Sequence, residues 1–134
     1  MLTSLSRPFR PIELRADTLE FFQLARLADD LKSQDEYART GVAAITLARD
    51  EHVTLVLVSL RKGAEMREHR APSAAAVVLL SGRVSFHAGG DAAQTELGPG
   101  SMAAFAADLP HAVEALEDAA YLLMIGGRHR HAVS

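Results

Sequence analysis

From residue 42 onward, hydrophobic and polar positions fall into short segments that turn residues separate. The turns are rich in Gly, Pro and Asp and lie at 49–51, 81–82, 89–91, 98–100 and 108–110. The segments between them predict β-strands at 42–48, 53–60, 65–70, 74–80, 83–88, 93–97, 102–106, 111–116 and 119–125. Many short strands joined in this way are typical of a β-sandwich or β-barrel. The pattern therefore predicts an all-β barrel from about Gly41 to Gly126.

The first forty residues follow a different pattern. Residues 1–16 contain Pro8 and Pro11 and predict an extended arm. From Asp17, apolar residues recur mainly every three or four positions, at Leu19, Phe22, Leu24, Leu27 and Leu31. This spacing predicts one amphipathic helix that ends near Ser33. We therefore expect an arm and helix at 1–40, a β-barrel at 41–127 and a C-terminal tail at 128–134.

Composition limits the chemistry that this barrel can perform. The 134 residues suffice for one domain whose core needs no disulfide or metal. Hydrophobic residues make up 49% of the chain but aromatic residues only 5%, so the core should be aliphatic. Cysteine is absent, which excludes thiolate catalysis and thiolate metal sites. Because the sequence has no segment like a signal peptide or a membrane span, we expect a cytoplasmic protein.

The charge distribution and the apolar surface of the chain indicate which binding partners to expect. The net charge is −3, and Arg83 is the only Lys or Arg between Ala71 and Gly127. A phosphate backbone would find no cationic surface there, so we expect a small-molecule ligand and neither nucleic acid nor membrane. The proline-bearing arm and the apolar strand at 53–60 would leave a sheet edge and aliphatic surface exposed in a monomer. A homodimer is therefore expected.

Two histidines lie in segments that resemble the motifs of the cupins. The first motif is matched by Gly63, His69 and Gly82, and the second by the turn Gly98-Pro99-Gly100 with Pro110 and His111. The chain is also similar to small, single-domain bacterial cupins of the conserved-barrel type, through Ala44-Ile45-Thr46-Leu47, Glu68-His69 and the segment from Val113 to Asp118. The resemblance implies an RmlC-like jelly-roll β-barrel with one N-terminal helix.

The chain departs from the cupin motifs at positions that bind metal. Ala71 and Ala75 stand where the cupins have a second histidine and a glutamate, and Ala115 replaces an expected asparagine. In metal-bearing cupins this second histidine and this glutamate hold one divalent ion together with two further histidines. For this chain the resemblance implies either no cofactor or one divalent ion (Fe, Mn, Zn or Ni) on His69 and His111. Two histidines are fewer than the three protein ligands that catalytic sites usually supply.

Strand alternation predicts which side chains share the interior with these histidines. In a regular strand, Glu65 and Arg67 lie on the face of His69, and Glu68 lies on the other face. Glu65 is therefore the expected third metal ligand, and Arg67 a cation that would favour an anionic group. Alternation also places Val84, Phe86, Val113 and Ala115 inside and Glu114 outside. The other histidines, His52, His87, His129 and His131, are expected to be solvated.

Three functions remain open at this point. One is a binding module that holds a small, partly apolar molecule around His69 and His111, oriented by Arg67 or Glu65. Another is a metal-dependent enzyme of the dioxygenase or isomerase type that uses a reduced ligand set. The third is a structural or regulatory dimer with a vestigial pocket. The missing histidine and glutamate favour the binding module over the enzyme.

Overall fold

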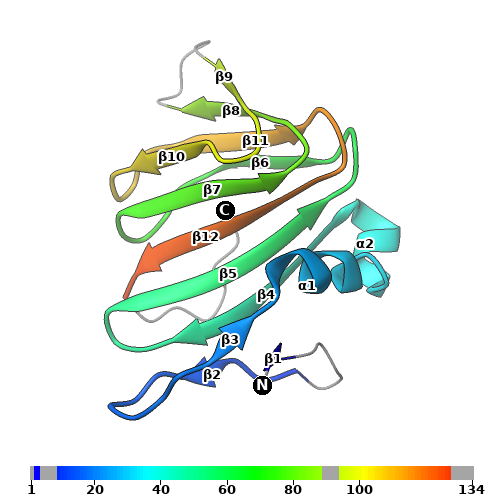
Figure 1. Ribbon diagram of the computed structural model, residues 1–134. Coiled ribbons are helices and arrows are strands. Elements are labelled where there is room, and N and C mark those ends of the chain that lie inside the picture. Colours follow the sequence, from blue (N-terminus) through cyan, green and yellow to red (C-terminus); the bar gives the residue numbers. More distant parts are fainter. Residues whose placement is uncertain (1, 4–8, 89–93, 128–134) are drawn as a thin grey trace.

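The computed structural model describes residues 2–3, 9–88 and 94–127, which form two facing sheets, a separate parallel pair of the two-residue strands β1 (Leu2–Thr3) and β3 (Phe21–Phe22), and two short helices (Figure 1). In chain order the elements are β1 (Leu2–Thr3), β2 (Ile12–Glu13), β3 (Phe21–Phe22), α1 (Leu24–Leu31), α2 (Asp35–Thr40), β4 (Val42–Arg49), β5 (Val53–Leu60), β6 (Glu65–His69), β7 (Ala75–Ser81), β8 (Val84–Ala88), β9 (Gln94–Leu97), β10 (Met102–Phe105), β11 (His111–Ala115) and β12 (Ala119–Gly126). The larger sheet has the order β10-β7-β12-β5-β4-β2, and the smaller has the order β6-β11-β8-β9. This architecture confirms the predicted all-β jelly-roll.

The strands from β4 to β12 fall on the predicted segments to within one residue at each end. Turn chemistry explains the agreement at the hairpin between β4 and β5. There the Asp50 carboxylate accepts hydrogen bonds from the backbone N–H groups of His52 (2.7 Å) and Val53 (2.9 Å). An Asp side chain that bonds the backbone a few residues later is a common way to close a turn. The predicted turn at 89–91 and the tail at 128–134, with His129 and His131, lie outside the described residues.

The N-terminal region differs from its prediction. Strand β2 pairs in parallel with β4, and the side chain of Glu13 accepts a hydrogen bond from Nε of Arg49 at 2.7 Å. Helix α1 begins only at Leu24, and β3 and a second helix, α2, flank it. The predicted stripe fails before Leu24 because Leu19 is 74% exposed and Phe22, although it packs against the smaller apolar cluster, belongs to strand β3.

Two clusters of buried apolar side chains hold the sheets and the helices together. The larger cluster fills the space between the two sheets and includes fully buried Val77, Tyr121 and Leu123. The smaller one packs Leu27 and Leu31 of α1 onto the outer face of the larger sheet. Figure 1 shows both helices on that face, beside β4 and β5. No helix in the described part of the chain is long and apolar enough to cross a bilayer.

The larger sheet leaves part of its outer face uncovered by helix. Strand β5 is paired on both sides, with β4 and β12, and α1 packs against it, so the prediction that residues 53–60 leave an open edge was wrong. In Figure 1 the helices do not extend over β12, β7 and β10. Seven partly or largely exposed residues on this outer face are apolar, and two of them, Leu80 and Leu122, also pack against the smaller cluster: Ala76, Val78, Leu80, Met102, Ala104, Leu122 and Met124. We call this set the bare face.

Candidate ligand-binding site in the barrel interior

The structure brings His69 and His111 together. His69 ends β6 and His111 begins β11, and the two residues are direct partners in the antiparallel pairing of these strands. The centroids of their rings are 4.2 Å apart, with the ring planes tilted by 58°. Residues so far apart in sequence meet because the chain between them forms β7 to β10 and then returns to the small sheet. The predicted convergence of the two imidazoles is therefore observed.

A β-bulge in β6 changes which neighbours accompany His69. The pairing runs from His69 opposite His111 to Met66 opposite Val113, so three steps along β6 match two along β11. One additional residue reverses the alternation of side chains beyond it. Met66 therefore enters the core, where it is 9% exposed. The inward orientation predicted for Glu65 and Arg67 was wrong, because the prediction assumed a regular strand.

Glu65 and Arg67 lie instead on the outer surface of the small sheet. Both are exposed, and they line a groove of about 460 Å³ together with His87 and Glu114. Glu65 is therefore not placed to complete a site with His69 and His111. In the described residues, no group of three His, Cys, Asp or Glu side chains is arranged to hold a metal ion.

The interior around the histidines is apolar and aromatic. Phe86 of β8 stacks on His111 with centroids 5.7 Å apart and planes within 5°. Phe105 of β10 also contacts His111, at 4.4 Å, and lies 5.6 Å from Phe86. Alternation in β8 predicted the inward position of Phe86, but the role of Phe105 was missed. As the one aromatic residue of the alanine-rich segment 102–107, it could have been found from the sequence.

The metal-ligand positions that differ from the cupin motifs are also part of this core. Ala71 and Ala75 are 3% and 7% exposed and pack in the same apolar cluster as Phe86 and Phe105. Methyl groups thus stand where a second imidazole and a carboxylate would be. The donor set of the described residues does not fit a catalytic metal centre, because it supplies two imidazoles and no third ligand.

Each imidazole is held by a backbone carbonyl. Nδ1 of His69 lies 2.6 Å from the carbonyl oxygen of Arg67, and Nδ1 of His111 lies 3.0 Å from that of Leu109. Burial lowers the pKa of His111 below the usual value of histidine, the bond to Leu109 opposes this, and the neighbouring His69 lowers the pKa further. The ring of His111 is thus held neutral at pH 7.

One polar atom of the site has no partner among the described residues. Nε2 of His69 is buried, yet it makes no hydrogen bond. Native proteins pair the large majority of such atoms, so each exception calls for an explanation. The described interior therefore contains one buried nitrogen that lacks a hydrogen-bond partner, next to a second imidazole and two phenylalanine rings.

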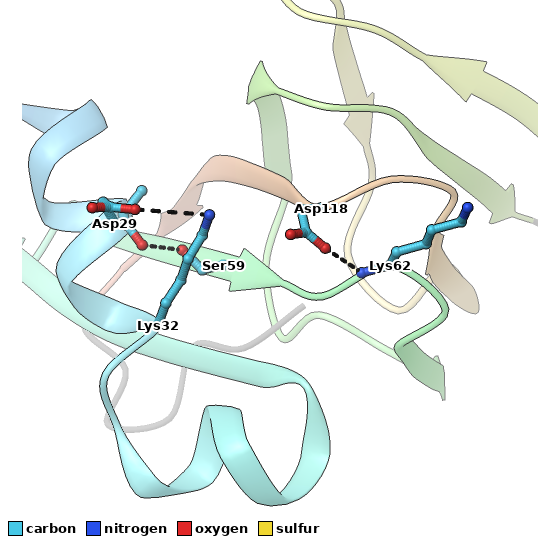
Figure 2. Close-up of polar contacts among 6 residues, drawn as sticks. Asp29, Lys32, Ser59, Lys62 and Asp118 are labelled. Atoms are coloured by element: carbon cyan, nitrogen blue, oxygen red, sulfur yellow. Dashed lines mark hydrogen bonds and ion pairs between the residues drawn. The ribbon is translucent and has the colours of Figure 1, made fainter.

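Away from the histidine pair, a cavity of about 660 Å³ lies between α1 and the outer face of the larger sheet. Figure 2 shows the contacts of four polar residues that line it. Ser59 Oγ donates to the Ala28 carbonyl (2.7 Å), and Lys32 Nζ lies 3.8 Å from an Asp29 carboxylate oxygen. Asp118 accepts a hydrogen bond from the backbone N–H of the neighbouring Lys62 (2.8 Å). Its charged rim is solvent-exposed. Although this cavity is sizeable, it contains no buried polar atom in need of a ligand, so the interior is the stronger candidate site.

Solved structures show the same fold. A conserved protein of unknown function from Streptococcus pyogenes aligns with a TM-score of 0.59 and 24% identity, over 74% of this chain and 90% of that one. A Cupin 2 conserved barrel domain protein from Leptotrichia buccalis aligns with a TM-score of 0.63 and 25% identity, over 75% and 46%. Oxalate decarboxylase from Bacillus subtilis, which has Mn(II) centres, aligns with a TM-score of 0.58 and 22% identity, over 69% and 26%.

Sequence comparison gives the family. No curated protein matches the chain significantly. The model of the Cupin domain family, however, matches residues 56–126, which is more than half of the chain. The match spans β6 and β11, the strands that carry the histidine pair, and includes strands of both sheets of the jelly-roll. The chain therefore belongs to the cupin family.

Proposed function

We propose that this cupin binds a small, partly apolar molecule in the barrel interior, with its polar end on His69 and His111. The observation that carries the proposal is the buried Nε2 of His69, which has no partner among the described residues. Leaving a buried acceptor unpaired costs about 1–3 kcal/mol. A ligand that contacts this nitrogen removes that cost, and Phe86 and Phe105 supply apolar contact for its body.

A metal-dependent reaction has less support. Some cupin structures, such as that of the manganese-containing oxalate decarboxylase, belong to metal enzymes. In this chain Ala71 and Ala75 occupy two of the ligand positions, and Glu65 lies on the outer surface. The carbonyl-bound Nδ1 of His69 leaves its Nε2 for an ion, but even with His111 two imidazoles alone leave an ion short of protein ligands.

The experiment uses protein purified without a histidine tag. Its metal content is measured by plasma mass spectrometry, and bound organic molecules are measured by native mass spectrometry. We expect metal well below one ion per chain, and a small organic adduct that dissociates on unfolding. Stoichiometric iron, manganese, zinc or nickel would contradict the proposal and favour the enzyme.

Matched variants locate the adduct. His69→Phe removes the unpaired nitrogen and keeps a planar ring, so the adduct should be lost. His52→Ala changes a histidine in the exposed turn between β4 and β5, so the adduct should be retained. Equal loss in both variants would contradict binding at His69. We also propose a cytoplasmic location, in keeping with a chain that has no cysteine.

A further inference from the structure

The backbone determines which nitrogen of His69 carries the hydrogen. The partner of its Nδ1 is the carbonyl oxygen of Arg67, at 2.6 Å. A carbonyl oxygen only accepts hydrogen bonds, so Nδ1 must be the donor. In the neutral imidazole the other nitrogen, Nε2, then has a free lone pair and acts only as an acceptor.

The second histidine has the same arrangement. Nδ1 of His111 donates to the carbonyl oxygen of Leu109, which, like Arg67 for His69, lies two residues earlier in the chain. Both contacts are local, and the bulge in β6 places Arg67 where the register with β11 shifts. The two rings therefore share one tautomer, and neither presents an N–H from Nε2 to the interior while it is neutral.

The surroundings disfavour an anionic ligand. A carboxylate at Nε2 of His69 would place its oxygen lone pairs against a nitrogen lone pair. The side chain of Arg67, predicted to balance such a charge, is exposed on the outer groove. Phe86 and Phe105, the other rings of the cluster, are uncharged. A buried carboxylate without a donor or a cation is strongly unfavourable.

We infer that the interior ligand presents a hydrogen-bond donor, a hydroxyl or N–H group, to Nε2 of His69, and that carboxylates and simple ketones are disfavoured. The inference rests on the proposed function and adds the chemical class of the ligand. Alcohols, phenols and N–H heterocycles with an apolar or aromatic body belong to this class. The donor satisfies the buried nitrogen, and the body packs on the phenylalanine rings.

The test compares three probes of similar shape: cyclohexanol, cyclohexanone and cyclohexanecarboxylate. Each is titrated over the millimolar range into ¹⁵N-labelled protein, and long-range ¹H–¹⁵N spectra report both imidazole nitrogens of His69. We expect hydrogen on Nδ1 and not on Nε2 before titration. Cyclohexanol should bind roughly tenfold more tightly than cyclohexanone, because one hydrogen bond is gained and an acceptor–acceptor contact is avoided. Its binding should shift Nε2 more than Nδ1.

Variants assign the preference to His69. In His69→Phe the alcohol and the ketone should bind equally, because the apolar contacts remain and the acceptor is gone. In His52→Ala the tenfold preference should persist. Hydrogen on Nε2 of free His69, or equal or tighter binding of cyclohexanone or the carboxylate by the wild type, would overturn the inference but leave interior binding intact. If no probe shifts a signal of His69 or His111, interior binding itself is contradicted and the inference fails with it.

Discussion

Acidification should destabilise this cupin through His111. The side chain is 1% exposed, and burial is the main cause of its lowered pKa. When the pKa is lower in the folded state, the unfolded chain binds more protons as the pH falls through about 6.5. Stability is therefore complete above the unfolded pKa and is lost progressively below it, until the pH reaches the pKa of the folded state.

The size of the effect has a clear upper limit. If folded His111 took up no proton, lowering the pH from about 7.5 to about 5.5 would cost about 1.4 kcal/mol, the free energy of protonating an imidazole of pKa about 6.5. The rings that contact His111 in the described part of the chain are the imidazole of His69 and the uncharged rings of Phe86 and Phe105. None of these carries a negative charge that would stabilise the protonated ring. We expect a loss of about 0.5–1.4 kcal/mol from this residue.

Urea unfolding of the wild type and of His111→Phe at the two pH values measures this loss. Phenylalanine keeps a ring that can stack on Phe86, and contributions from carboxylates cancel when the two proteins are compared. The wild type should lose more stability on acidification than the variant, by the amount given above. A His52→Ala control should lose as much as the wild type. Equal losses in the wild type and His111→Phe would refute the reasoning.

Four further substitutions test other parts of the structure. His69→Phe should raise the free energy of unfolding of the ligand-free protein by about 1 kcal/mol, because a buried unpaired acceptor is removed; a clear loss in denaturant titration would speak against this. Gly82→Ala should lower the free energy of unfolding by more than about 3 kcal/mol, because a Cβ there would lie 2.1 Å from the Asp118 carbonyl oxygen and φ is +74°. Gly100→Ala should lower it by only about 1–2 kcal/mol, because φ is +86° but the space around a Cβ is open. Similar losses of stability in the two glycine variants would contradict this prediction, because they would show that the structure relieves the contact between the new Cβ and the Asp118 carbonyl oxygen. We propose that the bare face pairs with a second copy, so light scattering should find a wild-type dimer at micromolar concentration and a monomer for the variant of the exposed Met102, Met102→Lys; a monomeric wild type would exclude the dimer.

Most of the strands of the barrel could be predicted from local patterns in the sequence. Turn residues such as Asp50 act within a few positions, so the strand boundaries could be predicted from the sequence. The pairing of His69 with His111 could be predicted from the resemblance to the two cupin motifs, because the family fixes how the strands between them fold back.

Features that depend on contacts between distant segments could not be predicted in this way. The bulge in β6 exists only relative to β11, and it moves Glu65 and Arg67 out of the interior. Helix α1 packs its buried residues against the outer face of the larger sheet, whereas Leu19 stays exposed, so the apolar spacing that includes Leu19 was misleading. The carbonyl partner of His69, and with it the acceptor role of Nε2, is likewise a property of the folded strand.

A high-resolution crystal structure of the untagged protein as purified tests the central claim most directly. The account predicts density for a non-metal atom at hydrogen-bonding distance from Nε2 of His69, about 2.7–3.2 Å. The remaining ligand density should lie against Phe86 and Phe105. A metal ion at about 2.0–2.1 Å from the Nε2 atoms of both His69 and His111 would contradict the account.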